Sequence, residues 1–297
     1  MAGGQERVLR RRIKSVQSTK KITKAMELIA ASRIAKAQQR VASARPYADA
    51  ITEVIGNLAL SGAGSKSPLL VPREEVRTVG FVVVAADRGL CGGYNASIIR
   101  TAEASIKHAQ TVGQDYYLVC VGKKVESYFK FRKYRIAAVI NGTSDRPTYE
   151  DARRVAASIV PAFEAGEVDQ VELVFTQFLS AGTQKVVQRR FMPIDTTALA
   201  DGAAADTGPK ADYEYEPEPA EILDRLLPRY AEAKLFSAML EASASEHAAR
   251  QRAMAAASEN ADELITKLTR LRNRARQDSI TTEIMEIVGG AEALSQK

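Results

Sequence analysis

Hydrophobic side chains at both ends of the chain recur at alternating spacings of three and four residues. From Leu9 the spacing selects Ile13, Val16, Ala30, Ile34, Ala37, Val41, Ala44, Ala48, Ile51, Ile55 and Leu58. From Met254 it selects Ala257, Ala261, Leu264, Leu268, Leu271 and Ala275 and, after a slip, Ile280, Ile284, Ile287 and Ala291. This alternation is the seam of a coiled coil. Since neither tract can bury its seam alone, we predict two long helices packed antiparallel.

The middle of the chain alternates between apolar runs and amphipathic segments instead. We predict strands at 78–86, 116–121, 135–140, 171–178 and 184–193, and helices at 94–111, 123–132 and 149–165. Strand and helix in alternation indicate a mostly parallel sheet, here closed by an antiparallel pair. The predicted fold class is α/β, with a Rossmann-like central domain and a long antiparallel coiled coil. The predicted divisions are a helix at 1–62, the α/β domain at 76–197, a loop at 198–219 and a helix at 220–297.

Two local features modify this outline. Pro228 either kinks the second long helix or marks its first turn. In the first helix, polar Thr23 interrupts the seam, with Lys20 and Glu27 on either side, while Ile22, Met26 and Ile29 form an apolar stripe displaced by one residue. The helix therefore either turns its apolar face at this point or meets a different surface.

Composition narrows the possible classes of protein. Aromatic residues make up 6% of the 297 residues and tryptophan is absent, which suits thin, closely packed helices better than one thick core. The two cysteines, Cys91 and Cys120, form no CxxC pair, so we expect neither a disulfide framework nor a zinc site, and a cytoplasmic setting. No run reaches the roughly 20 apolar residues of a membrane span, and we expect neither export nor membrane insertion.

The net charge of +6 is concentrated near the N-terminus. The basic residues there are Arg7, Arg10, Arg11, Arg12, Lys14, Lys20, Lys21, Lys24, Arg33, Lys36, Arg40 and Arg45. Such a tract favours an anionic partner, with nucleic acid as the first candidate and an acidic protein surface as the second. A solvated helix face is the third interpretation.

The segment ADRGLCGGYN, residues 86–95, follows a predicted strand and precedes a predicted helix. Phosphate-binding loops occur at such places, but the segment matches neither GxxxxGK[ST] nor GxGxxG. A tight turn that exposes Arg88 and Cys91 to a partner is the favoured interpretation. Catalysis by Cys91 is not expected, because the two histidines, His108 and His247, fall in predicted helices elsewhere.

A second basic patch lies deep in the C-terminal helix. It comprises Arg270, Arg272, Arg274 and Arg276, with Gln277 beside them. Because an arginine fork bonds a carboxylate at two points, this patch suits an acidic loop of another protein. Beyond it the chain becomes apolar at Ile280, Ile284, Ile287 and Val288. A charged patch (the collar) followed by an apolar helix end (the tip) is expected of a helix whose end is enclosed by an apolar surface of another protein. Met26 fits either buried helix packing or a partner contact.

Three blocks of sequence resemble the gamma subunit of F-type (rotary) ATP synthase of the bacterial type. They are RIKSVQSTKKITKAME at 12–27, DRGLCGG at 87–93, and NRARQ at 273–277 continuing into ITTEIMEIVGGA at 280–291. The last block fits the family signature I-T-x-E-x-x-E-x-x-x-G-A throughout. Together the blocks span nearly the whole chain.

The resemblance implies a non-catalytic rotor shaft with no cofactor, metal ion or catalytic residue of its own. Its implied partners are the α and β subunits of the catalytic head, the ε subunit and the membrane ring of c subunits, on the cytoplasmic face of the plasma membrane. Proton flow turns such a shaft, and differential contacts with the three β subunits shift their catalytic sites. An acidic protein partner then accounts for the basic tract, and nucleic acid is not required.

The resemblance also implies contact residues. Arg276 and Gln277, with Thr281 and Glu283 beyond them, correspond to the contact with β loops near the top of the shaft. Met26 and the segment of Arg88 and Cys91 correspond to the contact with the acidic helix-turn-helix lever of β. Ile284, Ile287 and Val288 form the implied tip.

This sequence departs from the family pattern in places. Arg272 stands where many relatives carry an aromatic residue, residues 198–211 look like an insertion, and the two cysteines do not reproduce the redox pair of chloroplast relatives. Two other classes of function stay open at this point. One is a basic coiled-coil protein that binds nucleic acid, and the other is a nucleotide-dependent enzyme built on the sheet domain.

Overall fold

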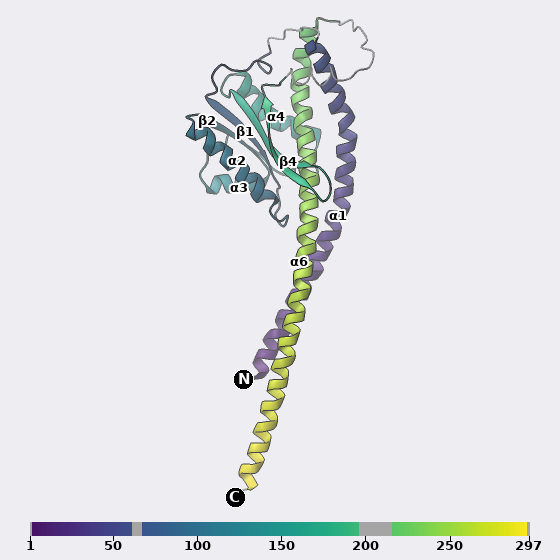
Figure 1. Cartoon of the computed structure of the whole chain (residues 1–297), viewed down its shortest axis with the longest axis vertical. Helices are drawn as coiled ribbons and strands as arrows, with labels where there is room; N and C mark the ends of the chain where they lie inside the picture. The colour runs from purple at the N-terminus through teal and green to yellow at the C-terminus, as the bar shows by residue number, and fades with distance from the viewer. Residues whose placement is uncertain (1, 61–66, 196–215, 296–297) are drawn as a thin grey trace. The chain divides into compact units, whose positions relative to one another are not determined.

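The computed structural model describes residues 2–60, 67–195 and 216–295, and it contains two long helices and a five-stranded sheet (Figure 1). In chain order the elements are α1 (Ala2–Leu60), β1 (Thr78–Val84), α2 (Tyr94–Thr111), β2 (Asp115–Val121), α3 (Lys123–Phe131), β3 (Ala138–Ile140), α4 (Tyr149–Glu164), β4 (Gln170–Phe178), β5 (Gln184–Met192) and α6 (Pro219–Ser295). The α/β class with two long terminal helices is confirmed. Positions 61–65 and most of the predicted 198–219 loop lie outside the described residues.

The sheet has the strand order β3-β2-β1-β4-β5. β1 pairs in parallel with β2 and β4, and β2 pairs in parallel with β3, whereas β5 runs antiparallel to β4. This is the predicted parallel sheet with an antiparallel closing pair, and its order matches five strands of a doubly wound fold. β3 is shorter than predicted, because the N–H of Arg135 is donated to the Tyr116 hydroxyl at 2.9 Å rather than to a neighbouring strand.

Both faces of the sheet are covered. α2 and α3 pack on one face around Phe81, Leu118 and Phe129, each of which is buried (Figure 1). α4 and parts of both long helices pack on the other face, with Ile55 of α1 and Leu227 of α6 fully enclosed. Burial on two sides explains why β1 is one continuous apolar run rather than an alternating one.

A buried carboxylate joins α2 to α3. Glu103, which is 9% exposed, accepts hydrogen bonds from the hydroxyls of Tyr128 at 2.9 Å and Tyr134 at 3.0 Å, and it pairs with Lys107 at 3.1 Å. Burial acts to raise the pKa of Glu103, but these donors outweigh it and the pKa is lowered. Burial, together with the same contact, raises the pKa of Tyr134 to about 12.

The lowered pKa of Glu103 predicts an acid-sensitive sheet domain. A depressed carboxyl contributes stability that is fully present above its unfolded pKa, about 4.3, and is lost as pH falls through its folded value. We expect the urea midpoint of unfolding to drop as the pH falls below about 4.3, and Glu103→Gln to flatten that drop. Glu167→Gln, at an exposed position, is the control. An unchanged slope in Glu103→Gln would contradict the assignment.

The chain divides into two compact units, which are described separately. Unit 1 comprises residues 1–30 and 250–297, and unit 2 comprises residues 31–249. In unit 2, α6 begins at Pro219, so Pro228 lies inside the helix and does not mark its first turn. Proline suits the first position of a helix because its missing N–H would have no partner there.

In unit 1 the first segment of α1 packs antiparallel on the last segment of α6. Ile13 and Ala30 of α1 are buried, as predicted. On α6 the buried positions from Met254 onward are Met254, Ser258, Ala261 and Leu268, whereas Leu264 and Leu271 are 38% and 46% exposed. The predicted seam of α6 was therefore wrong at those two leucines.

A pair of hydroxyl groups accounts for this difference. Thr23 and Ser258 are both buried, and their oxygens lie 2.7 Å apart across the two helices. Each hydroxyl also bonds a carbonyl of its own helix, those of Lys20 and Met254 at 3.0 Å. With Thr23 in the seam, α6 presents Ser258, and Leu264 and Leu271 are turned outward while Leu268 stays buried.

Candidate functional site

The turn after β1 is organised by the carboxylate of Asp87. It accepts backbone N–H bonds from Lys123 at 3.1 Å, Gly142 at 3.0 Å and Ser144 at 3.1 Å, which lie beyond the carboxyl ends of β2 and β3. Burial acts to raise the pKa of Asp87, but the backbone donors outweigh it and lower the pKa. The carboxylate satisfies the amide at the start of α3 that a phosphate would otherwise need, which disfavours a nucleotide site at this point.

The rest of the turn is fixed by Asn95. Its side-chain oxygen accepts from the N–H of Ala86 at 2.9 Å, and its amide donates to the carbonyl of Arg88 at 3.3 Å and to Cys91 Sγ at 3.2 Å. Cys91 is 1% exposed, so the expectation that its side chain faces a partner was wrong. Its thiol is held inside the turn because the small, weakly polar side chain packs under the backbone.

The side chains that the turn exposes are those of Arg88 and Leu90. Arg88 is exposed, as predicted, and Leu90 is 63% exposed with φ of 62°. A left-handed backbone is unfavourable for leucine, and such strain persists only where the surrounding bonds fix the turn. The prediction missed Leu90, although an apolar residue between glycines in a polar turn was a visible signal.

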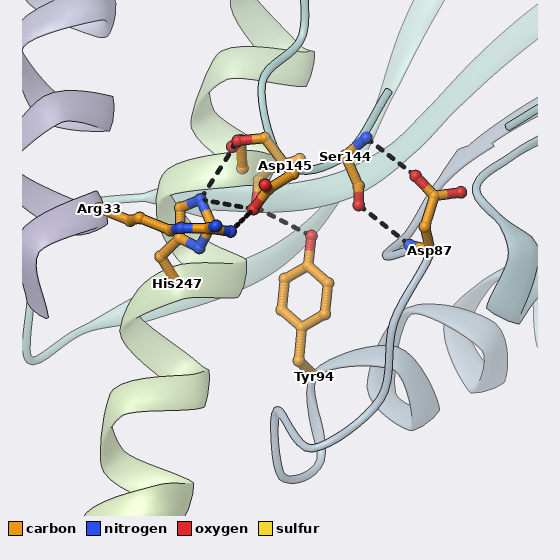
Figure 2. Close-up of polar contacts among 8 residues, drawn as sticks. Arg33, Asp87, Tyr94, Ser144, Asp145 and His247 are labelled. Atoms are coloured by element: carbon orange, nitrogen blue, oxygen red, sulfur yellow. Dashed lines mark hydrogen bonds and ion pairs between the residues drawn. The ribbon is translucent and has the colours of Figure 1, made fainter. Parts of the chain in front are cut away.

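Figure 2 shows a second polar centre in unit 2, around Asp145 on the loop between β3 and α4. Its carboxylate pairs with Arg33 of α1. Its carbonyl accepts from Ser243 at 3.3 Å and lies 3.3 Å from His247 Nε2, both on α6. No signal in the sequence singled out Asp145, because its partners lie about a hundred residues away in both directions.

In unit 1 the structure decides between the two readings of the apolar stripe near Met26. Ile22 and Ile29 are 61% and 53% exposed, while Thr23 occupies the seam and Met26 is half-buried. Ile22 and Ile29 are therefore turned away from the partner helix and are available to another surface, whereas Met26 lies between the two environments.

The end of α6 is exposed along its whole described length. Arg276, Gln277, Thr281 and Glu283 are exposed, and each residue from 280 to 291 is exposed. Among the tip residues, Ile284, Ile287 and Val288 are 54%, 72% and 55% exposed. Soluble chains rarely leave so many large apolar side chains in water unless a partner covers them.

The candidate residues thus fall into two groups. Arg88, Cys91 and the missed Leu90 share one turn of unit 2, and Met26, Arg276, Gln277, Thr281, Glu283 and the tip residues belong to unit 1.

The described part of the chain contains no group of three metal-ligating side chains. Burial raises the pKa of Cys120 to about 12, so this thiol stays protonated at neutral pH.

Comparison with known proteins identifies the family. The family model described as ATP synthase matches residues 5–294. The chain is 49% identical to the ATP synthase gamma chain of Parafrankia sp. (strain EAN1pec), over 98% of each protein, and 47% identical to that of Mycolicibacterium smegmatis, over 97% of each. The chain belongs to the ATP synthase gamma chain family.

The fold agrees with that of chains in solved structures of mitochondrial ATP synthases. The Tetrahymena thermophila mitochondrial ATP synthase central stalk and c-ring includes a chain that aligns with a TM-score of 0.61 and 24% identity, over 80% of this gamma chain and 99% of that one. A chain of the Euglena gracilis mitochondrial enzyme aligns with a TM-score of 0.64 and 17% identity, over 98% and 95%. At these identities the likeness shows the shared fold.

The family also clarifies the exposed segments. All three sequence blocks that carried the resemblance lie within the matched residues. No described helix of this gamma chain is long and apolar enough to cross a membrane. The apolar residues near the end of α6 are therefore too few for a span, and they form an exposed surface at the end of a helix.

Proposed function

We propose that this gamma chain is the central rotor shaft of an F-type ATP synthase. It couples proton-driven rotation of the membrane c-ring to conformational change in the catalytic β subunits. The observation that carries this proposal is the end of α6, where the exposed residues Arg276 and Gln277 precede the exposed apolar residues Ile284, Ile287 and Val288. A helix with this surface is suited to turn inside a ring of other subunits, with the arginine bonding acidic loops.

The partners in this proposal are the α and β subunits around the end of α6, and the ε subunit and c-ring at the sheet domain. The chain would lie on the cytoplasmic face of the bacterial plasma membrane as a peripheral subunit. Catalysis would reside in β, in line with membership of the ATP synthase gamma chain family. The chain's own contribution is mechanical.

The contacts with β fall on both units. We assign Arg276, Gln277, Thr281 and Glu283 to the β loops around α6. The acidic lever of β would meet the stripe of Ile22, Met26 and Ile29, and the turn of Arg88, Leu90 and Cys91. Because the Cys91 side chain is buried, its role in this contact is to hold the turn, and the contact itself falls to Arg88 and Leu90.

A basic coiled-coil protein that binds nucleic acid is the alternative, and only the arginine-rich N-terminal tract favours it. Such binding would fall steeply with salt, as release of counterions requires. The nucleic-acid alternative does not explain the exposed apolar tip that follows Arg276 on α6. Neither family membership nor the structural relatives support it.

Co-expression with candidate α and β subunits tests the proposed function. We expect one large particle whose multi-site ATP hydrolysis depends on this chain. Within that particle, Arg276→Ala with Gln277→Ala should lower ATP-driven proton pumping by roughly tenfold, the size of losing an interface anchor. Arg40→Ala is the control for a lost basic charge on α1.

Two outcomes would count against this assignment. Equal, small effects of the double variant and Arg40→Ala would remove the collar from the contact. Failure of the wild-type chain to join α and β that fold on their own would remove the rotor function, and salt-dependent binding of nucleic acid would then be measured.

A further inference from the structure

The loop between β3 and α4 contacts both long helices through one residue. The Asp145 carboxylate pairs with Arg33 on α1, and its main-chain carbonyl accepts from Ser243 Oγ on α6 at 3.3 Å. His247 Nε2 lies 3.3 Å from the same carbonyl and 3.7 Å from the carboxylate (Figure 2). Asp145 therefore bonds α1 and α6 at the same level of unit 2.

The residue before Asp145 holds the exposed turn after β1. Ser144 Oγ accepts from the Asp87 N–H at 3.0 Å, and the Ser144 N–H donates to the Asp87 carboxylate at 3.1 Å (Figure 2). On the other side of the turn, the Tyr94 hydroxyl donates to the carbonyl of Ala242 on α6 at 3.0 Å. Two routes of hydrogen bonds thus connect the turn of Arg88 and Leu90 to the long helices.

Stability alone does not account for the Asp145 centre. The side chains of Arg33 and Asp145 are 41% and 45% exposed, and exposed ion pairs add little to folding stability. His247 is 2% exposed, and burying a ring nitrogen costs free energy that its hydrogen bonds only offset. What polar groups of this kind provide is one defined geometry, because their bonds are lost when an element slides.

We propose that Asp145 is a positioning residue that holds the sheet domain and the two long helices as one body. When a partner displaces Leu90 or Arg88, the displacement then reaches α1 and α6 without slippage. This inference rests on the proposed rotor function and adds to it a joint through which force passes between the sheet domain and the shaft. Arg33, Ser243 and His247 are its points of attachment.

The test measures coupling in the assembled enzyme, as protons pumped for each ATP hydrolysed in reconstituted vesicles. Arg33→Met and Asp145→Asn should each lower that ratio by roughly two- to fivefold, the lower end of what a substitution between two coupled sites changes. Arg33→Lys, which keeps the charge, should recover most of it. Gln39→Met, at an exposed position of α1, should leave the ratio unchanged.

A double-mutant cycle separates one joint from two independent defects. Because Arg33 and Asp145 act through a shared contact, the double variant should be no worse than the worse single variant. If the fold-reductions of the two single variants multiply in the double variant, the two residues act independently, and the proposal is overturned. So would an unchanged ratio in particles that assemble in lower yield, since that is the result of a purely structural role.

The full chain alone provides a second readout for variants that do not assemble. Spin labels on Leu90→Cys and Gln38→Cys, both at exposed positions, report the distance between the turn and α1. Asp145→Asn should broaden the distance distribution, and a distribution as narrow as that of the unmodified loop would overturn the proposal. Failure of the wild-type chain to support pumping would contradict the rotor function itself, and the label distances would still decide the joint.

Discussion

Gly122→Ala will destabilise the sheet domain by at least about 4 kcal/mol, a loss typical of a severe backbone clash. Gly122 follows β2 with φ of 104°, and an added Cβ would lie 2.3 Å from the carbonyl oxygen of Ala85. A backbone carbonyl cannot rotate away as a side chain can, so β1 and β2 would have to separate. Tyrosine fluorescence in a urea titration follows this unfolding, because the chain has no tryptophan.

Gly142→Ala is the matched control for this variant. Gly142 has φ of 81°, and nothing lies within 4 Å of the Cβ it would gain. The control therefore carries the backbone strain without the clash, and we expect it to cost about 1 kcal/mol. If the two variants lost equal stability, strain rather than the close approach of Ala85 would explain the glycine at 122.

Asp87→Ala will cost about 3 kcal/mol, since it leaves three backbone N–H groups without their acceptor. These groups belong to Lys123, Gly142 and Ser144, so loops at the ends of β2 and β3 would loosen together. The exposed turn would lose its fixed position as well, and coupled turnover of the assembled enzyme should fall with stability. Urea unfolding and ATP-driven pumping measure the two effects.

Asp115→Ala serves as the comparison for Asp87→Ala. Its carboxylate is 57% exposed and pairs with Arg135 at 2.6 Å, so its removal should cost less than about 1 kcal/mol. A loss as large as that of Asp87→Ala would show that charge, rather than the three backbone donors, stabilises the turn.

Periodicity predicted most of α1 because an apolar seam runs along the helix on both sides of Thr23. Ile34, Ala37, Ile51 and Ile55 are all buried as the spacing required. On α6 the same reasoning selected Leu264 and Leu271, which are exposed, and passed over Ser258, which is buried. A leucine stripe indicates an apolar surface, but it does not say whether this chain or another protein covers it.

Polar contacts between distant segments were beyond the reach of the sequence. Thr23 and Ser258 are 235 residues apart, and Arg33 and Asp145 are 112 apart. Local patterns show which positions face inward and not which hydroxyl or carboxylate will meet. The turn at 87–93 was located correctly from its place between strand and helix. The inward position of Cys91 depends on its hydrogen bond with the Asn95 side chain, which no local pattern in the sequence indicates.

The exposed end of α6 has a consequence for how such chains diverge. Each residue from 280 to 291 is exposed, so folding of this chain places no packing demand on their side chains. Selection there can act only through whatever surrounds the helix, while Ile13, Ala30 and Leu268 are constrained by the chain's own packing. Where two species differ at Ile284, Ile287 or Val288, the surrounding subunits should therefore differ too. The residues at these positions would then reflect the surface of the partner.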